Sequence, residues 1–247
     1  MFAKGRVALV TGAGGVIGRE VALGFLREGV NVAAVDMSAE RLEETVADAK
    51  ELSGSIMTFK INVANKNECM KLVESIVAEY GRVDILANVA GVMINETIRN
   101  VTEEHWDLTQ EVNVKGPLYL TQAVFEHMKA QKYGRIINVC SPAYKGGFGQ
   151  MSYSASKGAL MSMTMVTAQE MAKYGVTANA VLPGLVSSNI TANMKPEMFE
   201  SIAARQPMGR ICKASDVAYA IRCFAADEAE YISGQMLMVT GAGTTVL

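Results

Sequence analysis

The sequence predicts an α/β fold in which a doubly wound sheet of seven mainly parallel strands is flanked by helices on both faces. Three observations support this prediction. Short apolar segments rich in β-branched residues recur along the 247-residue chain, longer segments with helical spacing lie between them, and no proline-rich or serine-rich linker interrupts the alternation. Strand, helix and strand in succession form right-handed crossovers, which produce a parallel sheet covered on both sides. We therefore expect a single domain over residues 1–247.

The strands are expected at uninterrupted apolar runs. A run without polar alternation indicates a strand whose two faces are both buried. In chain order these runs are Val7–Val10, Val32–Val35, Ile56–Ile61, Ile85–Ala90, Ile136–Val139, Val176–Val181 and Met236–Val239.

The segments between the strands have the periodicity of helices. Ser38–Leu52 begins with a candidate N-cap, Ser38, and acidic residues follow it closely. Further helical segments are Arg19–Glu28, Pro117–Lys132 and Tyr153–Lys173. One long stretch, at about 185–214, falls outside the alternation and holds a short amphipathic piece, Glu197–Ala204. Long connections in compact domains often cover binding sites, so we expect a substrate lid there.

Composition limits the partners of the chain. Lys and Arg number 23 against 25 Asp and Glu, a net charge of −2 with no basic block, so we expect no nucleic-acid partner. No apolar run reaches the ~20 residues of a membrane span, and the first residues do not resemble a signal peptide, so we expect no membrane partner. The four cysteines show no Cys-x-x-Cys spacing, and only two histidines accompany them. We therefore expect no metal site and a reducing, cytoplasmic location.

A glycine-rich turn follows the first strand. Residues 11–18 read Thr-Gly-Ala-Gly-Gly-Val-Ile-Gly and run directly into a helical pattern. Backbone N–H groups at such a strand-to-helix turn bind pyrophosphate, and missing side chains allow its close approach. Glycines alone are also compatible with a tight turn that binds nothing. A doubly wound sheet with a nucleotide at this turn would be Rossmann-like.

A carboxylate ends the second strand and favours one dinucleotide. Asp36 lies 18 residues after Gly18, where it can accept hydrogen bonds from the adenosine ribose and would repel a 2′-phosphate. Met37 follows, so no cation stands immediately after the strand to neutralise such a phosphate. We expect NAD as the cofactor. The alternative is that Asp36 serves only as a carboxylate at a helix N-terminus beside Ser38.

The residues expected to carry the chemistry lie around the start of a later helix. Tyr153 and Lys157 stand at i and i+4 and therefore on one helix face. A tyrosine of ordinary pKa (~10) is a poor base near neutral pH, and a neighbouring cation favours its phenolate. Ser141 lies 12 residues before Tyr153 and can hydrogen-bond the same substrate oxygen. A tyrosine and lysine at this spacing also occur on many helix surfaces without function.

Over essentially its whole length the chain resembles the short-chain dehydrogenase/reductase family. It matches the family pattern Thr-Gly-x-x-x-Gly-x-Gly at Thr11, Gly12 and Gly18, and it departs from the pattern at Val16. The family's Asn-Asn-Ala-Gly appears as Asn-Val-Ala-Gly at residues 88–91. The resemblance implies cofactor contacts at Gly12, Gly15, Ile17, Asp36, Asn62, Val63, Asn88, Ala90, Tyr153, Lys157, Pro183, Gly184, Val186 and Ser188.

The resemblance also implies a catalytic set of Asn113, Ser141, Tyr153 and Lys157. Tyr153 would take the alcohol proton while hydride leaves for the nicotinamide, Lys157 would also hold the nicotinamide ribose, and Asn113 would anchor a water in the proton path. A cysteine nucleophile at Cys140 is a weaker alternative. It would need a histidine or a helix end to form a thiolate, and both histidines lie in earlier helical segments.

The loop after Ser141 carries a narrower resemblance. Its Gly-Gly-Phe-Gly-Gln run at residues 146–150, together with the short spacing from Ser141 to Tyr153, resembles dehydrogenases that act on 3-hydroxyacyl-CoA thioesters. These include the paired subunits that oxidise (hydroxybenzyl)succinyl-CoA. The resemblance implies a small-molecule substrate of the secondary alcohol or ketone type. It also implies a homo- or hetero-oligomer, a dimer or tetramer, built through helices at Pro117–Lys132 and Tyr153–Lys173.

A different class of function stays open beside the enzyme. The chain would then be a degenerate, non-catalytic subunit with an impaired NAD site that supports a catalytic paralogue in a hetero-oligomer. The reason is Val16, because the family backbone passes closest to the pyrophosphate at this position. Asn62 and Val89 are further departures in the cofactor half of the chain.

Overall fold

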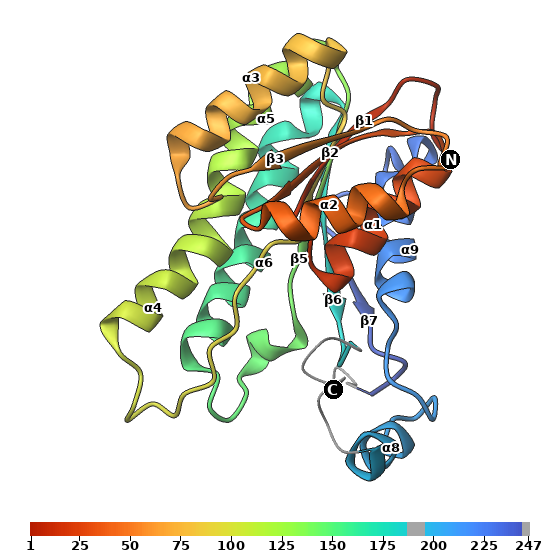
Figure 1. Ribbon diagram of the computed structural model, residues 1–247. Coiled ribbons are helices and arrows are strands. Elements are labelled where there is room, and N and C mark those ends of the chain that lie inside the picture. Colours follow the sequence, from red (N-terminus) through yellow and green to blue (C-terminus); the bar gives the residue numbers. More distant parts are fainter. Residues whose placement is uncertain (187–195, 244–247) are drawn as a thin grey trace.

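The computed structural model describes residues 1–186 and 196–243, which form three layers with one sheet between two layers of helices (Figure 1). The sheet has seven strands in the order β3-β2-β1-β4-β5-β6-β7, and every neighbouring pair is parallel. The strands are β1 (Val7–Thr11), β2 (Asn31–Asp36), β3 (Ile56–Lys60), β4 (Ile85–Asn88), β5 (Gly134–Val139), β6 (Val176–Pro183) and β7 (Met236–Val239). The predicted fold is confirmed, and each strand overlaps its predicted apolar run, with ends that differ by at most two residues.

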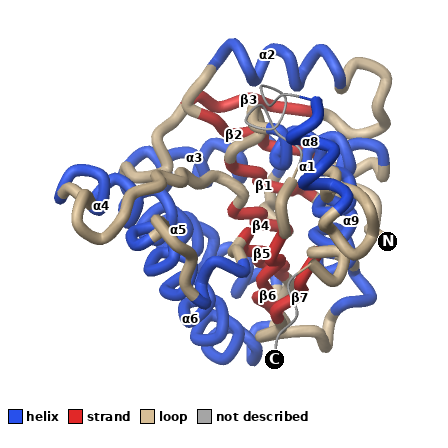
Figure 2. Tube along the Cα trace, turned by 90° about the horizontal axis from the view of Figure 1, so that it is seen from below, coloured by secondary structure: helices blue, strands red, loops and turns tan. Residues whose placement is uncertain are grey.

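Helices cover both faces of the sheet, as Figure 2 shows along the strands. One face carries α1 (Val16–Arg27), α2 (Ala39–Asp48) and α9 (Ala214–Ala225). The other carries α3 (Lys66–Tyr80), α5 (Gly116–Gln131) and α6 (Met151–Met171). Helix α4 (Glu103–Gln110) reaches α5 through a π-helical turn at Glu111–Lys115, and α8 (Pro196–Ala204) lies in the predicted lid. No helix among the described residues is both long and apolar enough to cross a bilayer.

Two apolar clusters explain why the strand sequences are continuously apolar. Val7 and Leu9 of β1 pack with α3 and α5, whereas Ala8 and Val10 of the same strand pack with α1 and α9. All four side chains are fully buried. Successive side chains of a strand point to opposite faces, so a sheet covered on both sides requires apolar residues at every position.

The predicted cap of α2 is also present. The Ser38 hydroxyl accepts a hydrogen bond from the backbone N–H of Arg41. The helix ends at Asp48, before the predicted end at Leu52, because the backbone turns after Ala49.

A charged network joins the strands at the amino edge of the sheet. Asp84, which precedes β4, is fully buried and accepts hydrogen bonds from three directions. The donors are Arg6 Nη1 at 3.1 Å, Arg82 Nε at 2.7 Å and the backbone N–H of Val7 at 2.9 Å. A buried carboxylate is tolerated only when it is paired and hydrogen-bonded in this way. The network therefore fixes the amino ends of β1 and β4 to each other.

Replacing Asp84 by alanine should leave the buried side of Arg6 and the Val7 N–H without a partner. Breaking a buried ion pair by removing one partner costs about 3–5 kcal/mol of unfolding free energy. Urea denaturation measures this loss, and Asp107→Ala, an exposed carboxylate on α4, should change stability by less than ~0.5 kcal/mol. A loss below ~1 kcal/mol in Asp84→Ala would show that the network is not structural.

Candidate active site

A continuous groove runs across the carboxyl ends of the strands. The strand order runs from β1 to β2 and β3 in one direction and from β1 to β4 and β5 in the other. Doubly wound sheets bind their ligands where the order reverses in this way, at the carboxyl ends of β1 and β4. One part, which we call the Asp36 groove, has a volume of about 550 Å³. The other part, which we call the Tyr153 cleft, has a volume of about 370 Å³. Ile17, Val89, Gly91 and Val92 line both parts and make them one space.

The glycine-rich turn forms the floor of the Asp36 groove. Gly12 has a φ of +66°, which L-residues rarely adopt, and the N–H of Gly15 donates to its carbonyl oxygen at 2.9 Å. A side chain at Gly18 would collide with the same carbonyl oxygen. Both glycines are therefore required by the backbone itself, and the turn places the start of α1 at the groove.

Asp36 ties this turn to the second strand. One carboxylate oxygen accepts from the N–H of Gly14 and the other from the N–H of Ser38, each at 3.0 Å. Asp36 also lines the groove. The two predicted roles of Asp36, at a helix N-terminus and at the adenosine ribose, are thus compatible. The carboxylate supports the start of α2 and also lines the space where a ribose would lie.

Arg41 is a groove residue that sequence reasoning missed. It stands in the first turn of α2, lines the Asp36 groove, and is exposed. In the described part of the chain no carboxylate lies within ion-pairing distance of its guanidinium. The signal was available, because a residue three positions after the cap Ser38 is directed back toward the strand end. A cation therefore stands beside Asp36 although none follows the strand directly.

Val16 lies at the entrance to α1 and lines the Asp36 groove. Its side chain is 38% exposed, so the isopropyl group lies at the groove surface rather than in the core. The preceding residue, Gly15, has an extended backbone with a φ of −85°. The departure from the family pattern therefore alters the wall of the groove and leaves the helix start intact.

Most of the predicted cofactor residues meet in this one space. Gly12, Gly15, Ile17, Asp36, Val63 and Ala90 line the Asp36 groove, and Ile17, Tyr153, Lys157, Pro183, Gly184 and Val186 line the Tyr153 cleft. Ser188 lies outside the described residues.

Two predicted cofactor residues do not line the groove. The side chain of Asn62 accepts from the N–H of Ala64 at 3.0 Å and closes a turn before α3. Asn88 is buried, and its Nδ2 donates to Asn138 Oδ1 at 2.8 Å across β4 and β5. Both side chains are used to hold the backbone that surrounds the groove.

The catalytic candidates converge where β5 ends and α6 begins. Lys157 is buried, and its Nζ donates to the carbonyl oxygen of Val139 at 2.8 Å. The same Nζ lies 5.5 Å from the centroid of the Tyr153 ring. Ser141, two residues after the end of β5, accepts from the N–H of Ala143 at 3.2 Å and lines the cleft with Tyr153 and Lys157. The three side chains thus face one space.

Burial governs the protonation of this group. Burial raises the pKa of Tyr153, and the hydroxyl of Ser141 partly offsets the rise. Burial also lowers the pKa of Lys157. The sequence predicted that the lysine would lower the pKa of the tyrosine, but burial raises it and only Ser141 acts in the opposite direction, so Tyr153 holds its proton at neutral pH.

Asn113 does not line the cleft but lies directly behind Gly91, which does. It is fully buried in the π-helical turn, its Oδ1 accepts from the N–H of Val92 at 2.8 Å, and its Nδ2 donates to the carbonyl of Val92 at 2.9 Å. The same Nδ2 lies 3.0 Å from Ser156 Oγ. The amide is therefore fully engaged by the protein, and it positions the segment after β4 against α6.

The cysteine alternative does not fit the site. Burial raises the pKa of the Cys140 thiol to about 11, and the nearby ammonium of Lys157 only partly offsets this. His105, one of the two histidines, hydrogen-bonds Glu96 at 2.8 Å. Cys140 is thus a protonated thiol, not a nucleophile.

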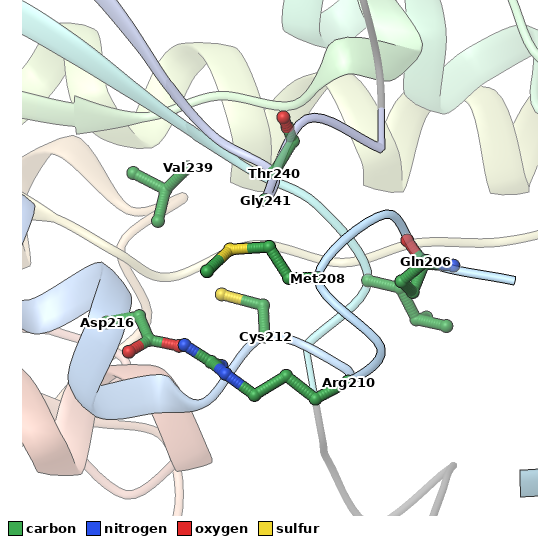
Figure 3. Close-up of a pocket in the computed structure, with 9 residues that line it drawn as sticks. Gln206, Met208, Arg210, Cys212, Asp216, Val239, Thr240 and Gly241 are labelled. Atoms are coloured by element: carbon green, nitrogen blue, oxygen red, sulfur yellow. The ribbon is translucent and has the colours of Figure 1, made fainter. Parts of the chain in front are cut away.

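A smaller cavity of about 220 Å³ lies behind the cleft, between the end of β7 and the segment before α9 (Figure 3). Arg210 Nη1 pairs with Asp216 at 2.6 Å. The side chain of Cys212 lies between this ion pair and Met208, and burial raises the pKa of its thiol. The backbone N–H of Cys212 donates to the carbonyl of Leu185 at 3.1 Å. This contact anchors the described beginning of the predicted lid, whose residues 187–195 lie outside the described chain.

Comparison of the sequence with known proteins identifies the family of the chain. The model of the family described as short chain dehydrogenase matches residues 6–198. The 3-oxoacyl-[acyl-carrier-protein] reductase FabG of Thermotoga maritima is 36% identical over 98% of both chains. The (2S)-[(R)-hydroxy(phenyl)methyl]succinyl-CoA dehydrogenase subunit BbsD of Thauera aromatica is 34% identical over 98% of this chain and 97% of that one, which confirms the narrower resemblance. The protein belongs to the short-chain dehydrogenase/reductase family of oxidoreductases.

Proposed function

We propose that this protein transfers hydride between NAD(H) and a secondary alcohol or ketone of the 3-hydroxyacyl thioester type. The observation that carries the proposal is the shared cleft of Ser141, Tyr153 and Lys157, which is continuous with the groove that holds Asp36. The names of two relatives support the substrate class, because one reduces a 3-oxoacyl thioester and the other is a dehydrogenase of a hydroxylated acyl-CoA.

The groove fits a dinucleotide. The turn around Gly12 and Gly15 would receive the pyrophosphate, Asp36 the adenosine ribose, and Lys157 the nicotinamide ribose, while Pro183–Gly184 would border the nicotinamide. When bound, the nicotinamide supplies or accepts the hydride.

The protein side chains handle the accompanying proton. In reduction, the phenol of Tyr153 donates its proton to the substrate oxygen, and the hydroxyl of Ser141 gives that oxygen a second hydrogen bond. In oxidation, the phenolate of Tyr153 accepts the alcohol proton. Because burial raises the pKa of Tyr153, the acid form is the resting form at neutral pH. The buried ammonium of Lys157 stabilises the phenolate once it forms.

The proposal includes assembly and location. An apolar groove of about 580 Å³ lies between α5 and α6 and exposes Leu118 and Val166. We infer that a second subunit of the same family packs there, in a homo- or hetero-oligomer. All four cysteines are free thiols, which supports a cytoplasmic location.

A second candidate function rests on Val16. Its side chain occupies part of the groove wall beside the expected pyrophosphate, so the chain could be a non-catalytic subunit that supports an active paralogue. The two candidates differ in whether the chain alone binds NAD.

Titration of the purified chain with NADH separates them. If the chain is an enzyme, calorimetry should show saturable binding of NADH at micromolar concentration. Val16→Gly should tighten this binding, because it removes an isopropyl group from the groove. Val21→Ala, a truncation in the core of α1, is the control for a general effect on the helix. Absence of binding at millimolar NADH would support the non-catalytic subunit.

Asp36 and Arg41 should decide between NAD and NADP. Asp36→Asn removes the charge that repels a 2′-phosphate and leaves Arg41 to attract it, so kcat/KM for NADPH relative to NADH should rise about tenfold, which corresponds to ~1.4 kcal/mol. Adding Arg41→Gln should cancel most of the gain, whereas Arg27→Gln at the far end of α1 should not. An unchanged ratio in Asp36→Asn would remove Asp36 from cofactor choice.

The raised pKa of Tyr153 predicts opposite pH dependences for the two directions. Alcohol oxidation needs the phenolate, so its kcat/KM should rise continuously as pH increases from 6 toward the raised pKa, whereas ketone reduction should stay nearly constant over the neutral range. Initial rates in both directions across pH test this. An oxidation optimum at neutral pH would contradict the assigned protonation.

Tyr153→Phe should lose turnover and retain NADH binding.

A further inference from the structure

Two exposed methionines line the continuous groove, one in each part. Met37 lines the Asp36 groove and is 62% exposed, and Met93 lines the Tyr153 cleft and is 45% exposed. Methionine is more often buried, where its flexible side chain fills gaps in the core. An exposed thioether is open to peroxides, which convert it to a sulfoxide. Oxidation at either residue would therefore place a polar oxygen in the groove.

The sulfur of Met93 contacts a second residue of the Tyr153 cleft. Gln150, which directly precedes α6, donates from its Nε2 to Met93 Sδ at 3.7 Å and to Asn95 Oδ1 at 3.4 Å. Both contacts are long, and a thioether sulfur is a weak acceptor. The side-chain amide of Gln150 therefore has no strong acceptor for its N–H groups among the described residues.

Oxidation of the sulfur would supply that acceptor. A sulfoxide oxygen accepts hydrogen bonds far better than the thioether that it replaces. Because an S–O bond and a hydrogen bond to its oxygen meet at an angle, the oxygen can bridge Met93 Sδ and Gln150 Nε2 at their present separation. The bridge would join the segment after β4 to the start of α6.

The bridge would change the cleft rather than the adenosine end of the groove. Met93 and Gln150 both line the Tyr153 cleft, and neither lines the Asp36 groove. Many other side chains of the cleft are apolar, among them Val92, Leu185 and Val186. A sulfoxide adds bulk and a polar atom to this wall and engages the N–H of Gln150. Substrate entry should therefore suffer, whereas NADH binding should not.

We propose that Met93 is a site of reversible oxidation that hinders substrate entry to the Tyr153 cleft. The oxidant is hydrogen peroxide or an alkyl hydroperoxide. A lone pair of the sulfur attacks one peroxide oxygen, the S–O bond forms and the O–O bond breaks, and the other oxygen takes up the proton and leaves as water or an alcohol. The sulfur is oxidised by two electrons, and the peroxide is reduced by two. A methionine sulfoxide reductase restores the thioether.

The cysteine of the cleft is a poor competitor for the peroxide. Cys140 is only 2% exposed, and burial raises the pKa of its thiol to about 11. The thiolate is the reactive form, so Cys140 reacts slowly near neutral pH. The two products also differ in their repair, because dithiothreitol reduces a sulfenic acid or a disulfide but not a methionine sulfoxide.

Peroxide treatment followed by catalase tests the proposal. Peptide mass spectrometry measures the sulfoxide at Met93, and initial rates with saturating NADH give kcat/KM for the acetoacetyl thioester of N-acetylcysteamine. The effect on turnover rests on the proposed function. In the wild type kcat/KM should fall about tenfold, the effect of one unfavourable polar contact, in proportion to the sulfoxide at Met93. Methionine sulfoxide reductase should restore the rate, and dithiothreitol should not.

Three variants locate the effect, each compared with its own untreated activity. Met93→Leu keeps a similar apolar volume without sulfur and should resist peroxide. Met70→Leu, at an exposed position of α3 that lines neither the groove nor the cleft, should lose activity as the wild type does. Gln150→Leu should form the sulfoxide but lose less activity, because the bridge is missing. An equal loss in Gln150→Leu would overturn the bridge.

The outcomes separate this inference from the proposed function. Full activity with Met93 completely oxidised, the same loss in Met93→Leu, or recovery with dithiothreitol alone would overturn the oxidation site as a control on turnover. Failure of the untreated protein to reduce the thioester with NADH or NADPH would instead overturn the proposed function. The mass spectra would then still decide whether Met93 is oxidised.

Discussion

The buried hydrogen bond from Lys157 to the carbonyl of Val139 is the interaction on which the candidate site depends. Lys157 is only 4% exposed, and a buried polar group is stable only when a hydrogen-bond partner holds it. The bond fixes the start of α6 against the carboxyl end of β5. Tyr153 lies one helical turn before Lys157 and Ser141 lies just after β5, so the same bond brings the phenol and the hydroxyl to one cleft. Burial lowers the pKa of Lys157 and raises that of Tyr153, so it disfavours the charged form of both groups.

The opposite end of the groove depends on a balance of charges. Asp36 holds the glycine-rich turn through the N–H of Gly14, so its carboxylate serves the fold and faces the groove at once. Arg41 faces the same groove from α2. In the proposed function, the carboxylate would favour NAD and the guanidinium would favour NADP, so their relative reach, rather than either residue alone, would set the cofactor preference. Val16 adds bulk to the same wall without disturbing the helix that begins there.

Local patterns predicted most of the fold and the central part of the site. All seven strands follow from apolar runs, and the positions of Asp36 and Tyr153 follow from where a strand ends and a helix begins. The remaining site residues depend on meetings between distant segments. Asn88 was expected at the cofactor; its Nδ2 donates to Asn138 on the next strand, while its Oδ1 has no partner within the described residues. Arg41, by contrast, lies three residues after the cap Ser38, which is a local signal for its place in the groove.

The two ends of the sheet thus have different tasks. The amino edge carries the buried Asp84 network that joins strands, and the carboxyl edge carries the groove and the cleft. The central claim is that Tyr153 protonates a ketone oxygen while hydride arrives from a nicotinamide bound across this edge. The most direct measurement uses NADH with deuterium at both C4 positions and the acetoacetyl thioester of N-acetylcysteamine, followed by mass spectrometry. The account predicts a 3-hydroxy product with one deuterium on the carbinol carbon. A product without deuterium, or no product at all, would contradict it.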